Sequence, residues 1–266
     1  IFHGDTNLRV LQPIDEAAWI WLPGHDRWGA AAFNETRPDA LQKEPSTFVR
    51  FRKRFTAVVG EPLEIDVSAD ERYVLMLDGR EISRGPHRGL VQRWHYQSYR
   101  ISNLAPGEHL LEAVCWQLGV HAPLAQLSVR GGFILKAEGD YDAALSTGRT
   151  PWQVAPLHST TMLGQGQSAA WGVGSESRSC GTSFYGEEPP PAAWTAAAVV
   201  RPPIGPEDCG VVAPGWFLFP SALPDQLHGR RTPGRARAAR ADDSNAWFRA
   251  KDAAHPLVKD FDALLK

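Results

Sequence analysis

Apolar and polar residues alternate along residues 48–55, which read FVRFRKRF. Val49, Phe51 and Phe55 fall on one side of an extended chain, and the intervening arginines fall on the other side. A period of two residues is typical of a β-strand with one face buried and one face in water. We therefore predict a sheet that packs its apolar face into a core and leaves its arginine face open to solvent.

The following segments continue this period. Apolar residues alternate with acids over 63–67, and an apolar run over 73–77 ends at Asp78-Gly79. This dipeptide favours the positive φ angles of a tight hairpin turn, so a strand is expected to begin near Arg80. Further strands are predicted over 110–116, around 127–129 and over 133–135. Strands at this spacing, with little helical periodicity between them, predict an all-β fold: an antiparallel, jelly-roll-like β-sandwich.

The character of the sequence changes near residue 139. The sandwich core is expected over about 45–138, and residues 139–225 scatter tryptophans among Gly, Ser and Pro, which predicts a loop-rich extension. Residues 228–243 are rich in arginine and poor in large apolar residues, as in an exposed linker. We expect a β-domain over 1–225 and a linker over 226–266, whose apolar end FDALL predicts continuation into a further domain.

Composition narrows the class of partner. Net charge is −2 and the pI is near 6.5, which disfavours nucleic acid and anionic membranes as partners. No apolar run has the roughly 18 residues that a bilayer span needs. The three cysteines lack zinc-site spacing: Cys115 is predicted in the core, and whether Cys180 and Cys209 pair stays open, as does the compartment.

Motifs of catalysis are absent from the sequence. It contains no Gly-x-Ser-x-Gly elbow, no phosphate-binding loop and no His-Glu-x-x-His metal motif. Glycoside hydrolysis needs two carboxyl groups beside the scissile bond, and the acids considered for it are interpreted as solvated surface groups: Asp70, Glu71, Glu187 and Glu188. We therefore predict no catalytic residue in this chain.

A polar, aromatic connection over 84–99 is the strongest candidate for ligand contact. Aromatic faces stack on the C–H faces of sugars, and planar donors hydrogen-bond their hydroxyl groups. Five residues of the connection combine these properties: Arg88, Arg93, Trp94, His95 and Tyr96. The alternative is structural, in which Trp94, Tyr96 and Trp116 close the end of the sandwich.

Several motifs resemble one family in their order along residues 19–225. SADERYVLMLDGREISRGPHRG and RWHYQSYRISNLAPGEHLLEAVCWQLG resemble the N-terminal β-domain of bacterial α-L-rhamnosidases of glycoside hydrolase family 78. WIWLPG, FVRFRKRF, STGRTPW and GWFLFPSALPDQ occur in the expected order around them. In that family the β-domain precedes a catalytic (α/α)₆ barrel, and no counterpart of the barrel is recognised in this sequence.

The resemblance implies an accessory domain whose partners are a carbohydrate, such as a rhamnose-containing glycan, and the catalytic domain of the same enzyme. A purely structural or protein-interaction sandwich without sugar binding is the alternative. No cofactor is predicted. Some sugar-binding sandwiches hold calcium, for which Asp70 and Asp78 are weak candidate ligands.

Overall fold

The computed structural model describes residues 11–24, 45–90, 93–122, 128, 130–162, 177–179, 185–204 and 216–224. The chain divides into two units, Ile1–Asp225 and Gln226–Lys266, and all of the described residues belong to the first. The predicted linker therefore lies outside the described residues, as do Cys180, Cys209 and both apolar residues of the strand predicted around 127–129, Leu127 and Val129. No helix in the described ranges is long and apolar enough to cross a membrane.

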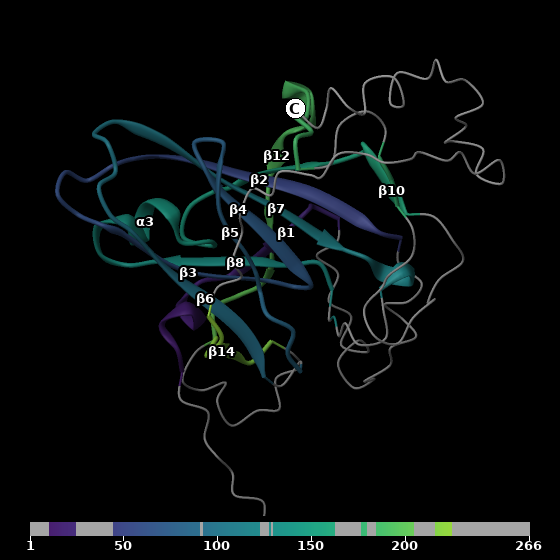
Figure 1. Cartoon of the computed structure of the whole chain (residues 1–266), viewed down its shortest axis with the longest axis horizontal. Coiled ribbons are helices and arrows are strands. Elements are labelled where there is room, and N and C mark those ends of the chain that lie inside the picture. The colour runs from purple at the N-terminus through teal and green to yellow at the C-terminus, as the bar shows by residue number, and fades with distance from the viewer. Residues whose placement is uncertain are drawn as a thin grey trace, which may run out of the picture. The chain divides into compact units, whose positions relative to one another are not determined.

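Two six-stranded sheets confirm the prediction of an all-β sandwich (Figure 1). The first sheet has the order β13 (Ala198–Arg201), β1 (Trp19–Trp21), β8 (Phe133–Ala137), β3 (Leu63–Ala69), β6 (Trp94–Ile101) and β14 (Leu218–Pro220). The second has the order β12 (Thr195–Ala196), β9 (Gln153–Pro156), β2 (Thr47–Thr56), β7 (Glu108–Gln117), β4 (Arg72–Leu77) and β5 (Arg80–Gly85). The jelly-roll-like connectivity stays a prediction.

The remaining elements are short. β10 (Thr160–Met162) and β11 (Ser177–Ser179) form a separate two-stranded sheet. Among the described residues, the helical elements are η1 (Pro13–Glu16), η2 (Gly119–His121), η3 (Gly139–Tyr141), η4 (Pro191–Ala193) and α3 (Asp142–Leu145). Each has at most four residues, so burial between and around the sheets has to stabilise the fold.

Strand alternation builds the core that the sequence predicts. Val49, Phe51 and Phe55 of β2 all point into the main apolar cluster. Phe51 stacks on Phe133 of the first sheet, with ring centroids 5.1 Å apart, so the two sheets meet there. Cys115 is fully buried as a free thiol, which confirms its predicted core position.

The hairpin predicted at Asp78-Gly79 is present. Asp78 and Gly79 have φ angles of 51° and 73°, and the turn joins β4 to β5, which starts at Arg80. Positive φ at both central residues matches the twist of the flanking strands, as in a type I′ turn. The Asp78-Gly79 dipeptide was therefore sufficient to predict this hairpin from local sequence.

The predicted solvent-open arginine face is wrong at Arg50. Its side chain points away from the core as expected, yet the residue is only 5% exposed. Arg50 pairs with Glu112 on the neighbouring strand and donates to the carbonyl oxygen of Tyr185. A segment that is distant in sequence covers this part of the outer face. The alternation of apolar and polar residues in one strand cannot predict such a contact.

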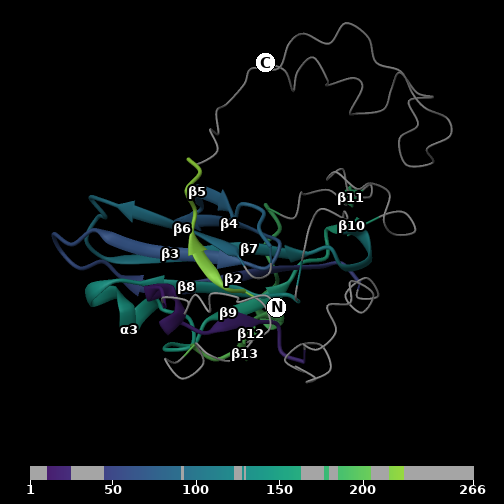
Figure 2. The ribbon, with the colours of Figure 1, turned by 90° about the horizontal axis from the view of Figure 1, so that it is seen from below.

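The connection predicted over 84–99 contains a strand. Residues from Trp94 onward form β6, which pairs antiparallel with β3, so the loop ends at about residue 93. β14 pairs parallel with β6 at the sheet edge, which departs from the expected purely antiparallel arrangement (Figure 2). The pairing partner is more than a hundred residues away, so local patterning did not reveal it.

Residues 139–225 contribute to both sheets. β9 and β12 lie in the second sheet, and β13 and β14 form the edges of the first. Trp152 and Trp216 are 1% and 0% exposed, and Trp216 stacks on Trp19 with centroids 4.1 Å apart. Trp152 and Trp216 therefore belong to the core of the sandwich, although they lie in the predicted loop-rich extension.

Candidate functional site

Trp94 and Tyr96 lie in the core, as the structural alternative expects. They are 1% and 5% exposed. The Trp94 indole N–H donates to the Ala69 carbonyl oxygen at 3.0 Å, and the Tyr96 hydroxyl donates to Gln12 Oε1 at 3.3 Å. Burial, together with the nearby carboxylates of Asp66 and Asp15, raises the pKa of Tyr96 to about 12. Neither ring offers a free face to a ligand, so the prediction that these two stack on a sugar is corrected.

Of the other three predicted contact residues, two are exposed and one is partly buried. Arg93 is exposed, and its guanidinium lies 5.6 Å from the centroid of the Phe219 ring. Arg88 is also exposed. Its positive charge acts on Arg72, whose pKa is lowered to about 10, first by the burial of Arg72 and second by the charge of Arg88. His95 is partly buried, and its Nδ1 has no hydrogen-bond partner among the described residues. Successive side chains of a strand point to opposite faces, which separates Trp94 and Tyr96 from His95.

A cleft of about 450 Å³ opens at the outer face of the second sheet, where β2 begins. It lies between η2 and the segment that joins β9 to β10. Its walls mix apolar, hydroxyl and imidazole groups, from Pro45, Ser46, Phe48, His121, Leu157, His158, Thr160, Thr161 and Met162. Phe48 and Leu157 are each 5% exposed and form its apolar floor.

The described walls of the cleft carry no permanent charge. None of its nine described lining residues is an Asp, Glu, Lys or Arg. His158 and Thr161 are exposed at the rim, so an imidazole and a hydroxyl group face the solvent there. Small-molecule sites typically combine an apolar floor with a few polar groups, and volumes of about 300–1,000 Å³ are usual. The cleft therefore suits a small, uncharged and hydroxyl-rich ligand.

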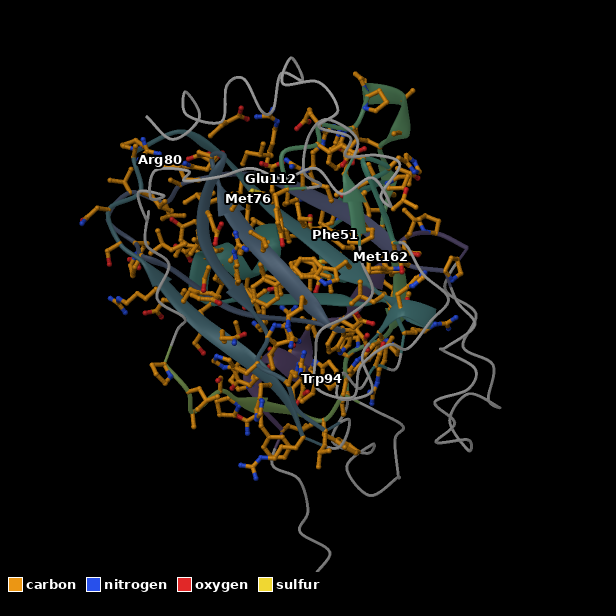
Figure 3. The ribbon with its side chains drawn as sticks, turned by 45° about the vertical axis from the view of Figure 1, so that its right-hand side comes forward. Phe51, Met76, Arg80, Trp94, Glu112 and Met162 are labelled. Carbon is orange, nitrogen blue, oxygen red and sulfur yellow. The ribbon has the colours of Figure 1, made fainter. Side chains whose placement is uncertain are left out.

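Aromatic surface continues beyond the cleft. Trp116 of β7 lies opposite Phe48 of β2 in the strand register and is partly exposed. An apolar cluster of the outer face surrounds the pair, formed by Phe48, Val74, Met76, Val114 and Leu157, with Trp116, Leu118, Met162 and Tyr185 packed against it. Met76 of this face and Met162 of the cleft lie apart from Trp94 in Figure 3. The alternation around Phe48 and Trp116 is the sequence signal for this surface, but it does not show that the two aromatic residues lie side by side.

The segment Tyr185–Glu188, called here the 185–188 strap, borders this surface. The Tyr185 ring packs edge-on against Trp116, with centroids 6.1 Å apart and an interplanar angle of 72°. The Glu187 carboxylate accepts hydrogen bonds from the backbone N–H groups of His158 and Ser159 at 2.8–3.0 Å. The strap is thereby joined both to the cleft rim and to the sheet.

A buried acid pair occupies the short corner between β3 and β4. Asp70 and Glu71 are 0% and 1% exposed, so their interpretation as surface acids is wrong. Asp70 accepts from the Trp216 indole N–H at 2.8 Å and from the Ser128 hydroxyl. Glu71 accepts from the backbone N–H of Leu118 at 2.8 Å, and burial, then the charge of Asp70, raises its pKa to about 8. Through these contacts Asp70 and Glu71 hold neighbouring loops against the corner, so both residues have a structural role.

The candidate calcium ligands are far apart. Asp70 precedes β4 and Asp78 follows it, so the whole strand separates them and they cannot bind one ion together. Asp78 Oδ1 accepts from the backbone N–H of Leu110 at 2.9 Å, and its Oδ2 lies 2.7 Å from His109 Nδ1. Across the described residues, no group of three or more His, Cys, Asp or Glu side chains is placed to hold a metal ion.

Comparison with known proteins finds similarity in structure. No family model matches the chain, and no curated protein sequence matches it. A GH78 family rhamnosidase of Bacillus sp. GL1 superposes with a TM-score of 0.52 at 22% identity, over 79% of this chain and 20% of that enzyme. This chain has the fold of a part of a GH78 rhamnosidase. The resemblance seen in the sequence is thus confirmed for the fold, and the chain spans about one fifth of that enzyme's length.

Two further structures show weaker similarity. An α-L-rhamnosidase of Streptomyces avermitilis complexed with L-rhamnose has a TM-score of 0.37 at 16% identity, over 70% of this chain and 14% of that one. A lectin from Pleurotus ostreatus in complex with GalNAc has a TM-score of 0.38 at 15% identity, over 81% of this chain and 51% of that one.

Proposed function

We propose that this chain is a non-catalytic, carbohydrate-binding accessory part of an α-L-rhamnosidase-like glycoside hydrolase, and that its sugar site is the cleft at the start of β2. The observation that carries the proposal is the chemistry of the cleft walls: an apolar floor of Phe48 and Leu157 below a rim of hydroxyl and imidazole groups. Sugars present C–H faces to apolar surface and hydroxyl groups to neutral donors and acceptors.

A non-catalytic role agrees with the positions of the acidic side chains around the cleft. Inverting and retaining glycosidases both need two carboxyl groups on either side of the scissile bond. None of the described acids lines the cleft. Glu187, the acid joined to its rim, accepts three hydrogen bonds from backbone N–H groups, which hold its carboxylate toward the chain. Hydrolysis in this proposal belongs to the catalytic part of the enzyme, which is also the proposed protein partner.

Rhamnose-containing glycans are the proposed ligands, because the enzyme with the same fold is a rhamnosidase. Arg88 and Arg93 stay proposed contacts outside the cleft, since both are exposed and carry planar donors. Trp94 and Tyr96 are left out of the proposal because they are buried.

Isothermal titration calorimetry with L-rhamnose and rhamnose-bearing oligosaccharides tests the proposal. We expect saturable binding, and His158→Ala or Thr161→Val should weaken it by about fivefold, the equivalent of one hydrogen bond of about 1 kcal/mol. Thr56→Val is the matched control, since Thr56 is exposed at the far end of β2 and should bind as the wild type does. A flat titration of the wild-type chain would leave a purely structural domain and reject the proposal.

A further inference from the structure

The 185–188 strap crosses the outer face of the second sheet. Glu187 joins it to the residues after β9, and Arg50 joins it to β2. The Tyr185 ring packs on Trp116 of β7, and the Arg84 guanidinium of β5 lies 4.9 Å from the centroid of the same ring. Three strands of one sheet, β2, β5 and β7, and the segment after β9 are therefore tied to this short strap.

Buried charges fix the strap in this position. Arg50 Nη2 donates to the Tyr185 carbonyl oxygen at 2.6 Å, while its Nη1 lies 3.2 Å from Glu112 and 3.5 Å from Glu188. The side chains of Arg50 and Glu112 are each 7% exposed. Lifting the strap would remove a partner from a buried guanidinium, and an incompletely paired buried charge is strongly unfavourable. The strap is thus a fixed wall over the sheet.

The position of this wall limits how a glycan can extend from the cleft. Phe48 forms the cleft floor, and its neighbour across the strands is Trp116, the next aromatic surface along the face. Tyr185 stands edge-on at that point, so a sugar ring leaving the cleft over Trp116 meets the strap. The volume of about 450 Å³ lies in the lower half of the usual range for small-molecule sites, which suits about one or two sugar rings.

We infer that the cleft binds the terminal residue of a glycan and that the 185–188 strap excludes internal chain segments. The inference rests on the proposed function of the cleft. It assigns a specificity-determining role to Tyr185, which blocks the path over Trp116 while lying outside the cleft lining.

Titration with rhamno-oligosaccharides from disaccharide to hexasaccharide tests the inference on the wild-type chain. If only the terminal residue binds, the dissociation constant should change by less than about twofold along the series. If each added ring instead occupies a subsite of its own and contributes about 1.4 kcal/mol, the dissociation constant should fall roughly tenfold per ring. Saturable binding that tightens steadily with chain length overturns the inference and leaves the proposed function intact. Absence of binding to every saccharide rejects both.

Tyr185→Ala provides the second arm. With the ring removed, the path over Trp116 opens, so the hexasaccharide should bind at least about fivefold more tightly while the affinity for L-rhamnose stays unchanged. Thr195→Ala, an exposed change on β12, is the control for substitution on the same sheet. Equal hexasaccharide affinity of the folded Tyr185→Ala variant and the wild type contradicts the role of the strap, and the chain-length series decides the inference if that variant does not fold.

Discussion

Trp94→Ala separates a core role from a ligand-binding role at the residue that sequence reasoning placed in the binding site. Trp94 is 1% exposed in β6 and belongs to the main apolar cluster. Truncating a buried Trp to Ala costs about 3–5 kcal/mol through lost burial and the cavity left behind. The Ala69 carbonyl oxygen also loses the indole N–H that donates to it at 3.0 Å, which adds about 1 kcal/mol.

The expected loss of unfolding free energy is therefore about 5 kcal/mol, against a total of about 5–15 kcal/mol for an ordinary domain. Trp94→Phe keeps an aromatic ring at this core position but removes the N–H donor, so we expect the free energy of unfolding to fall by about 2 kcal/mol. Trp194→Ala is the matched control: Trp194 is partly exposed with the Arg52 guanidinium 3.7 Å from its ring centroid, and we expect a loss of about 1 kcal/mol.

Urea unfolding followed by tryptophan fluorescence and circular dichroism measures these differences, and calorimetry on each folded variant measures sugar binding. Trp94→Phe should be destabilised and bind L-rhamnose with wild-type affinity. A Trp94→Ala variant that keeps the wild-type unfolding midpoint but no longer binds the sugar would refute the core assignment and restore Trp94 as a ligand contact.

Two further predictions concern the corner between the sheets and the loop beside Trp21. Burial raises the pKa of Glu71 from 4.5 to about 8, so the folded state keeps a proton that the unfolded chain releases between these values. The contribution of Glu71 to stability is therefore fully present below about pH 4.5 and falls by up to about 1.4 kcal/mol per pH unit toward pH 8. Glu71→Gln should reduce that slope in urea unfolding near pH 5 and near pH 8, and an unchanged slope contradicts the assignment. Gly131→Ala places a Cβ against the buried Trp21 ring and should cost about 2 kcal/mol, whereas Gly60→Ala, with φ of +83° and open space around it, should cost about 1 kcal/mol. Equal thermal midpoints for the two variants would contradict the clash with Trp21.

Much of the second sheet follows from local sequence. The alternation over residues 48–55 gave β2 and its core-facing residues, and Asp78-Gly79 gave the hairpin between β4 and β5. Both features depend on neighbouring residues alone, since side-chain alternation has a period of two and a tight turn needs positive φ at two adjacent positions. The family-like order of motifs added the fold, which the structural similarity to a GH78 rhamnosidase confirms.

The candidate site depends on contacts between segments that are distant in sequence. Arg50 and Tyr185 are 135 positions apart, and their hydrogen bond closes a face that alternation predicted to be open. Trp94 is aromatic and lies beside arginines, as in a sugar site, yet the folded chain buries its ring. The cleft likewise combines residues 45–48, 121 and 157–162.

Sequence alone thus determined β2, the hairpin between β4 and β5, and which side of β2 faces the core, because these properties are set over a few residues. Tertiary structure decided which outer face is covered, which aromatic residues stay accessible and where a neutral cleft opens. Those properties arise only when segments separated by many tens of residues pack together, since accessibility belongs to the assembled surface and not to any single strand.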